Sequence, residues 1–414
     1  MLKTKIKNLE QRNRQEYRFK LYGKLSIAFS LLFLVLLLSS IFFKGYRALI
    51  RTQMQIEIDL TSFNKIEEIN LQKIDLLIKD YLKKIYQISN FKTEDSSLKN
   101  FTQLTPLVSR IASLEIYQQI KKNPNLLNQH NKFWISISSK ADMYFKYDNS
   151  SNLLPNQKQF LDEIKANDKI RKIINYKFLT NPDSREAEIS GVAVGVIGSI
   201  MVMVIFLALA FPVAIMSAFY LEEFAKKNFL TDLIEISINN LAAIPSIIYG
   251  LLGLVVYLQY MHLPRSSSLV GGMTLFMLVL PVIIIATRNT IRSIPQNIRD
   301  GAMAIGATKM QVVIHHLLPL SIPGIMTGTI LAVSRALGET APLLMIGMVA
   351  FIADIPMSFF DPATVLPVQI FLWSDLQETG FVEKTSLAIL MLLIILMMFN
   401  LTAILLRKKF ERKW

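Results

Sequence analysis

Long uncharged apolar stretches alternate along this chain with polar stretches rich in lysine and arginine. Residues 25–43 contain no charged side chain. A helix of that length spans roughly 28 Å at about 1.5 Å per residue, which matches the hydrocarbon core of a bilayer. Five further apolar stretches lie at residues 191–220, 236–262, 266–287, 320–353 and 385–406. The pattern predicts a polytopic all-α membrane protein with six transmembrane helices.

The two ends of the chain are basic. Eight lysine and arginine residues lie within residues 1–24, and the chain closes on RKKFERKW at residues 407–414. Positive flanks of membrane helices stay in the cytoplasm, so both termini are predicted to be cytoplasmic. A cleaved signal peptide would also place an apolar segment after a basic one. The apolar run is long for that, and bulky residues rather than a cleavage site follow Ser39 and Ser40, so a membrane anchor is favoured.

Residues 44–188 differ from the rest of the chain because they are polar and mixed in charge. No glycine occurs between Gly45 and Gly191, and apolar residues such as Ile74 and Ile78 recur at helical spacing. The segment predicts a soluble, mostly helical domain on the periplasmic side, inserted between the first and second membrane helices. It contains no recognisable catalytic constellation.

Composition narrows the chemistry. Hydrophobic residues make up 52% of the chain and the mean hydropathy is +0.38, which is high for a soluble protein of this length. Cysteine is absent, which excludes disulfides and thiol nucleophiles, and the four histidines show no metal-ligand spacing, so no metal site is predicted. The net charge of +14 would suit nucleic acid. Much of that excess lies at the ends and beside apolar segments, where it sets orientation, so no nucleic-acid partner is predicted.

One apolar stretch carries two charges, because Arg335 and Glu339 both lie within residues 320–353. Insertion scales assign a cost of roughly 2.5–3.5 kcal/mol to such a side chain at mid-membrane, so ionised residues there are functional by default. Their spacing of four places both on one side of a helix. Counted from Pro323, Arg335 lies about 18 Å into the membrane.

A weak point follows this charged pair. Pro342 cannot donate a hydrogen bond to the carbonyl of Gly338, which weakens the helix there and makes Gly338 a candidate hinge. A buried structural ion pair is the alternative to a functional one. The predicted substrate pathway comprises Arg335, Gly338, Glu339, Thr340 and Pro342.

Two adjacent asparagines, Asn239 and Asn240, lie in the apolar stretch at residues 236–262. Amide side chains in a membrane need hydrogen-bond partners. We interpret them as interhelical polar contacts, with a contact to substrate as the alternative.

A polar, amphipathic loop at about residues 288–319 separates the fourth and fifth apolar stretches. It resembles the cytoplasmic signature of ABC-transporter permeases, which reads Glu-Ala-Ala, three residues, Gly, about nine residues, and then Leu-Pro. The corresponding positions are Asp300, Gly301, Ala302, Gly306 and Leu318-Pro319, with aspartate in place of glutamate and glycine in place of the first alanine. The pattern predicts two short helices with a tight turn at Gly306, which press into a groove on an ATPase partner. An ordinary amphipathic loop is the alternative.

Three further segments, at residues 220–254, 334–344 and 366–373, together resemble the PstA family, one of the two membrane subunits of the bacterial phosphate importer. The resemblance implies the type I ABC importer permease fold for residues 189–406, an inner-membrane location, and an extended periplasmic insertion at 44–188. It also implies a heterodimer with a second permease, PstC, two copies of the ATPase PstB, and the periplasmic phosphate-binding protein PstS. ATP and magnesium belong to the ATPase in this scheme; no cofactor is implied for this chain, which lacks a Walker loop.

The resemblance implies that phosphate is the anion that passes the charged pair Arg335 and Glu339. Phosphate carries one to two negative charges near neutral pH, and the planar guanidinium of Arg335 suits its oxygens. Glu339 would hold and partly neutralise Arg335 between transport events, as an intramembrane anion gate. A permease for sulfate or molybdate is the alternative within this class. A signalling receptor would need an output module after residue 220, and a membrane enzyme would need a nucleophile or a metal cluster, which the sequence does not offer.

Overall fold

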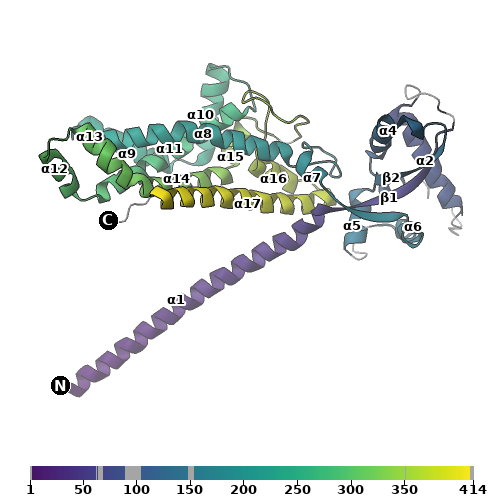
Figure 1. The fold of residues 1–414 in the computed structure, drawn as a ribbon. Helices are drawn as coiled ribbons and strands as arrows, with labels where there is room; N and C mark the ends of the chain where they lie inside the picture. The colour runs from purple at the N-terminus through teal and green to yellow at the C-terminus, as the bar shows by residue number, and fades with distance from the viewer. Residues whose placement is uncertain are drawn as a thin grey trace.

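In the computed structural model the chain consists of a helical bundle and an α/β domain (Figure 1). The α/β domain lies at one end of the bundle, and the short helices α12 (Gln296–Ala304) and α13 (Lys309–Val312) lie at the other (Figure 1). Helices dominate, as the sequence predicts. The structure describes residues 2–61, 63, 69–88, 104–147, 153–349 and 351–410.

The α/β domain is built on a three-stranded antiparallel sheet in the order β2-β1-β3. Its strands are β1 (Ile50–Asp59), β2 (His130–Ser136) and β3 (Ile170–Ile174). In the central strand, Met54, Ile56 and Ile58 are at most 2% exposed, because alternate side chains of a strand point to the same face. They share one core with apolar residues of α2 (Leu71–Ile88), α4 (Ala112–Lys122), α5 (Ser139–Lys146) and α6 (Pro155–Ala166).

The helices of this domain are predicted from the sequence, but the sheet is not. Helix α2 confirms the helical periodicity, since Ile74 and Ile78 are buried. Residues 54–59 alternate strictly between apolar and polar side chains, which is the signature of a half-buried strand. This strand pattern lies within a segment of mostly helical character, so the sheet was not predicted. The observed domain contains a three-stranded sheet in addition to the predicted helices.

The bundle contains the long helices α8 (Ala193–Phe219), α11 (Ser268–Ser293), α14 (Leu318–Gly338) and α17 (Thr379–Phe410). Among the described residues, five helices, α1 (Leu2–Gly45) included, are long and apolar enough to cross a membrane. Helix α9 (Phe229–Ala243) and the helical stretch Ser246–Tyr260, which begins with α10 (Ser246–Gly253), form a bent pair. The pair gives a sixth crossing if it is counted as one span. Each of the six predicted spans is therefore matched by a helix or by a pair of helices.

Shorter elements complete the chain. The short α-helices are α7 (Lys177–Thr180), α15 (Ala341–Met345) and α16 (Leu366–Ser374). Single π-helical segments extend α8, α10 and α13 at Tyr220–Phe224, Leu254–Tyr260 and Val313–Leu317. Short 3-10 turns lie at Tyr46–Leu49, Thr105–Leu107 and Pro124–Leu126.

Glycines allow close packing around α8 and α11. A Cβ atom built on Gly272 of α11 would lie 2.5 Å from Cγ2 of Ile205 in α8. One built on Gly198 of α8 would collide with the carbonyl oxygen of Thr364. Small residues at helix contacts permit such approach in a membrane, so the glycine-rich start of the second span is a packing face.

Two predicted spans are broken: the break in the third was not predicted, and the break in the fifth lies at the weak point predicted at Pro342. In the third, α9 ends before Pro245 and the two halves meet at 102°. Proline has no backbone N–H and its ring clashes with the preceding turn, so the helix cannot continue through it. In the fifth, α14 ends at Gly338 and α15 follows after a short break. Hydropathy alone does not register these breaks, because the residues on both sides are apolar.

Helix α1 diverges from the bundle along most of its length (Figure 1). It begins at Leu2, so the basic N-terminal segment continues directly into the first apolar span as one helix. Its last turn packs on α17, where a Cβ atom built on Gly45 would lie 3.0 Å from the backbone nitrogen of Leu387. Side chains of residues 25–37 are exposed, which suits a surface surrounded by lipid. The start of α1 and the end of α17 both lie on the side away from the α/β domain (Figure 1).

Candidate functional site

The break in the fifth span lies directly beside the intramembrane charges. Arg335 is in the last turn of α14, and Glu339 follows the helix with an extended backbone (φ −85°, ψ 112°). Helix α15 then begins with Pro342 in its first turn, where the missing N–H costs nothing. The weak point predicted at Pro342 is thus a complete helix break. Glu339 does not share a continuous helix with Arg335, which corrects that part of the prediction.

The two charged side chains meet across the break. Nε of Arg335 lies 3.7 Å from Oε1 of Glu339, and the two side chains are 40% and 22% exposed. This separation exceeds the ~2.7–2.9 Å of a tight charge-assisted hydrogen bond. Within the described part of the chain Arg335 has no second ion pair or hydrogen bond. Most of its donors are therefore available to a ligand.

The two broken spans are in direct contact. Gly250 of α10 lies against α15, since a Cβ atom built on it would be 2.6 Å from Cα and 2.7 Å from the carbonyl oxygen of Pro342. Its neighbour Tyr249 is within electrostatic range of Arg335. Discontinuous helices that meet in this way are typical of substrate pathways in transporters.

The structure brings the five predicted pathway residues into one region. Arg335 and Gly338 are exposed, Glu339 and Thr340 are half-buried, and Pro342 is buried against α10. A Cβ atom built on Gly338 would meet no described atom within 4 Å outside its own helix backbone and its two chain neighbours. The guanidinium is thus open to the surface of the chain and is not sealed among apolar side chains.

The loop between α12 and α13 has the predicted form. Gly306 has φ +92°, a conformation that favours glycine, and its N–H donates to the carbonyl of Met303 at 3.0 Å. The N–H of Ala307 donates to the carbonyl of Ala302 at 3.1 Å, which closes the end of α12. Thr308 then caps α13 by accepting from the N–H of Gln311. The two short helices and the tight turn at Gly306 are confirmed.

The outer face of this loop combines small, acidic and apolar side chains. Asp300 is exposed and accepts a hydrogen bond from Nε2 of Gln296 at 3.1 Å. A Cβ atom built on Gly301 would meet nothing within 4 Å, and Ala302 is buried. Three large apolar side chains project from the loop: Met303, Ile305 and Met310. Ile305 is 85% exposed, and together with Met303 and Met310 it leaves an exposed apolar patch at this end of the chain.

An ion-pair network holds this loop to the bundle, and sequence reasoning did not find it. Arg288 of α11 is 6% exposed, and its guanidinium lies 2.6 Å from Glu222 and 2.8 Å from Glu235. Arg292 contacts the same two carboxylates, and Arg299 of α12 lies 2.9 Å from Glu223. The adjacent acidic residues Glu222 and Glu223 are the feature of the sequence that could have indicated partners for these arginines.

Asn239 and Asn240 lie exposed on α9. In the described part of the chain neither side chain forms a hydrogen bond to another helix. The assignment of both residues to interhelical contacts stays a prediction. Over the same residues, no group of three histidine, aspartate or glutamate side chains is arranged to hold a metal ion.

Comparison with known proteins matches the two parts of the chain separately. Residues 210–414 match the family described as the binding-protein-dependent transport system inner membrane component. Residues 6–154 match a domain of unknown function, DUF3333. The probable ABC transporter permease protein YqgI of Bacillus subtilis is 28% identical over 245 residues, covering 56% of this chain and 82% of YqgI. The phosphate transport system permease protein PstA of Yersinia pestis is 30% identical over 223 residues, covering 54% of this chain and 73% of PstA.

A solved structure of the MetNI methionine ABC transporter is also similar, with 16% identity, a TM-score of 0.42, and coverage of 52% of this chain and 94% of that one. The family match and the apolar bundle define the class: a multi-pass permease of a binding-protein-dependent ABC importer in the inner membrane. Within this class, the chain belongs to the PstA-type permeases.

We expect Gly250→Val to destabilise the contact between α10 and α15. The added side chain must displace Pro342, and overpacking typically costs about 1–3 kcal/mol. Thermal unfolding of the purified permease in detergent checks this. Gly23→Val is the matched control, because a Cβ atom there meets nothing within 4 Å. Equal melting temperatures for the two variants would contradict the packing argument.

We expect Glu222→Gln to lower the melting temperature by weakening the network at the α12 end. It removes the carboxylate 2.6 Å from the buried Arg288, and a poorly satisfied buried group costs about 1–3 kcal/mol. Glu16→Gln is the control, because Glu16 pairs with Lys20 on an exposed surface, where such pairs contribute little. If both variants melt alike, the network does not stabilise the bundle.

Proposed function

We propose that this chain is a transmembrane permease subunit of an ATP-driven inorganic phosphate importer. It forms the pathway with a second permease, PstC, receives phosphate from PstS, and is driven by two copies of PstB, which use ATP and magnesium. The relatives named as phosphate permeases support the choice of substrate. The observation that carries the proposal is the open guanidinium of Arg335 at the break between α14 and α15.

The geometry of the charged pair suits transient binding of an anion. A phosphate that reaches Arg335 competes with the Glu339 carboxylate, which lies 3.7 Å from the guanidinium. The planar fork of arginine offers two parallel hydrogen bonds to phosphate oxygens. Glu339 partly neutralises the cation when phosphate has left, so the anion is bound weakly enough to be released. The break after Gly338 allows α14 and α15 to reorient during alternating access.

The α12–α13 loop is proposed as the contact with the ATPase. Its exposed apolar residues Met303, Ile305 and Met310 fit a groove on that partner. The ion pair between Arg299 of α12 and Glu223, in the segment that extends α8, ties the loop to the bundle, so a displacement of the loop reaches the membrane helices. In this proposal the loop and both termini are cytoplasmic, and the α/β domain, on the opposite side in Figure 1, is periplasmic. The basic flanks of the chain support this orientation.

We expect Arg335→Gln to abolish phosphate uptake while assembly persists. The variant keeps a polar side chain but removes the charge that compensates the anion. Uptake of radiolabelled phosphate in a strain lacking the native subunit measures the effect, and co-purification with PstC reports assembly. Arg407→Gln is the control, since that arginine only contacts Thr327 through a hydrogen bond at 3.2 Å among the described residues. Normal uptake by Arg335→Gln would remove this residue from the pathway. Uptake of radiolabelled sulfate or molybdate, but not of phosphate, by the wild-type importer would favour another oxyanion.

We expect Gly306→Val to detach the ATPase or to uncouple its turnover. A β-branched residue is strained at φ +92°, so the turn between α12 and α13 must change. Gly306→Asn is the matched control, because asparagine tolerates a left-handed conformation. ATPase association and stimulation are measured in membrane vesicles. Unchanged values for Gly306→Val would show that this turn does not set the contact.

A further inference from the structure

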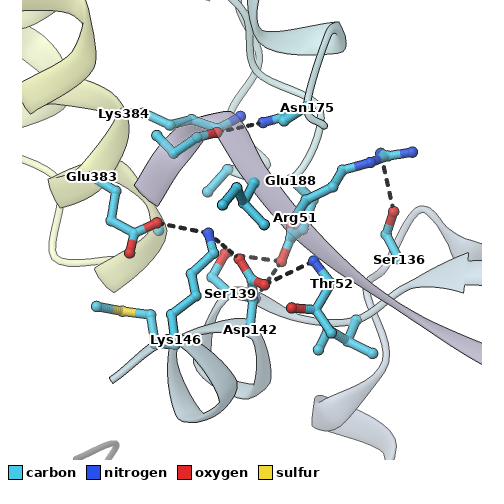
Figure 2. A pocket seen from close by; sticks show the side chains of 16 residues that line it. Arg51, Thr52, Ser136, Ser139, Asp142, Lys146, Asn175, Glu188, Glu383 and Lys384 are labelled. Atoms are coloured by element: carbon cyan, nitrogen blue, oxygen red, sulfur yellow. Dashed lines mark hydrogen bonds and ion pairs between the residues drawn. The ribbon is translucent and has the colours of Figure 1, made fainter. Parts of the chain in front are cut away.

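The α/β domain meets the bundle where α17 begins. Strand β1, helix α5 and the linker at residues 181–192 converge there around a cavity of about 40 Å³ (Figure 2). Charged side chains dominate the labelled residues of this junction and come from both parts of the chain (Figure 2). The matched domain of unknown function ends at residue 154 and contains α5, but it does not contain α17.

Lys146 forms an ionic bridge across the junction. Its Nζ atom lies 2.6 Å from Oδ2 of Asp142, within α5, and 2.8 Å from Oε2 of Glu383, in α17. The side chains of Lys146 and Glu383 are only 7% and 4% exposed. Burial acts to lower the pKa of Lys146, but the carboxylates of Asp142 and Glu383 outweigh it and raise the pKa. Lys146 therefore stays charged, and loss of either partner would leave a buried charge poorly compensated.

Ser139, at the other end of α5, adds a second contact. Its backbone N–H and its hydroxyl donate to Oε1 of Glu188 at 2.8 and 3.0 Å, and the hydroxyl also lies 3.1 Å from Oε1 of Glu378, just before α17. A Cβ atom built on Gly380 would lie 2.8 Å from Cβ of Ser139. The first turn of α17 and the start of α5 therefore touch, and a side chain at position 380 requires Ser139 and Ala187 to move slightly away from it.

Asp183 extends this junction toward the broken fifth span. It is 3% exposed, and its Oδ1 accepts from Nε1 of Trp373 in α16 at 3.0 Å and from Ser190 at 2.8 Å. Its Oδ2 accepts from the backbone N–H of Phe351 at 2.7 Å. Phe351 has φ +67°, which is uncommon for a bulky residue and needs support from its surroundings. Phe351 lies in the loop that follows α15, the half-helix beside the Arg335 break.

We propose that the α/β domain is a permanently docked clamp, in which Lys146 and Asp183 are positioning residues. Lys146 fixes the first turns of α17, and Asp183 fixes α16 and the loop after α15, so that Arg335 is presented in the pathway. Lys146 contacts Glu383, whose neighbour Lys384 donates to the carbonyl of Ser190. The hydroxyl of Ser190 donates in turn to Asp183, which binds Trp373 and the N–H of Phe351. The transport part of this inference rests on the proposed function; the docking part does not.

The absence of cysteine from the chain makes docking directly measurable. Ser139→Cys with Gly380→Cys places two thiols at the contact, within a small shift of the ~3.5–4.5 Å between Cβ atoms in a disulfide. We expect high cross-linking without any substrate, and unchanged phosphate uptake after oxidation, because the clamp stays closed. The two single cysteine variants control for local damage. Uptake that is blocked by oxidation and restored by dithiothreitol would overturn permanent docking.

The second arm tests Lys146 itself. In the double-cysteine background, we expect Lys146→Met to lower the cross-linking yield. As a single substitution, we expect Lys146→Met to lower the maximal uptake rate at least tenfold, with unchanged KM and membrane abundance. Lys146→Arg should retain most of both, since it keeps the charge. Lys132→Met is the matched control, because Lys132 is 64% exposed in the same domain.

The outcomes separate the two proposals. Full uptake by Lys146→Met at normal abundance would overturn the positioning role, and an unchanged cross-linking yield would overturn the clamp. If wild-type protein takes up no phosphate, the proposed substrate fails, while the substrate-free cross-linking yields still decide whether the domain docks through Lys146.

Discussion

A charge held in a medium of low polarity must be paired, and the tightness of the pairing separates the structural charges of this chain from the candidate functional one. Arg288 lies 2.6 Å from Glu222, and Lys146 lies 2.8 Å from Glu383; both cations are nearly buried. Arg335 lies 3.7 Å from Glu339 and is 40% exposed. Buried pairs that are broken cost several kcal/mol, so the first two hold their elements in place. The third pair is the loosest of the three, and it is the pair in which we propose that an anion replaces the carboxylate.

The loose pair lies where the helices are also interrupted. Pro245 ends α9, and the break after Gly338 ends α14. Gly250 lets the two resulting half-helices touch, because it has no side chain to separate α10 from Pro342. Backbone groups released by a helix break must find partners inside a membrane, so such breaks persist only where neighbouring elements or a polar cavity support them. Tyr249 of α10 supplies one such partner, since its hydroxyl donates to the carbonyl of Leu241 in α9 at 2.7 Å.

Sequence reasoning found what depends on local pattern and missed what depends on distant contacts. Uncharged runs such as residues 266–287 revealed the spans, and a glycine at fixed spacing revealed the turn at Gly306, which φ +92° confirms. The break before Pro245 was not predicted, because an apolar run reads alike whether or not its helix is continuous. Of the site itself, Arg335 and the weak point at Pro342 were found, but the partner half-helix was not. Glu222 and Arg288 are 66 residues apart, and no local periodicity records such a pair.

The positions of the tight and loose pairs also suggest how force passes through the molecule. Glu222 and Arg288 fix the α12 end of the bundle, and Lys146 and Glu383 fix the end at the α/β domain. Between these rigid ends lies the interrupted region around Arg335. Closely packed interiors transmit displacement rather than absorb it, so motion imposed at one fixed end is concentrated where the helices are already broken. A permease needs such an arrangement, because its pathway must open alternately to the two sides of the membrane.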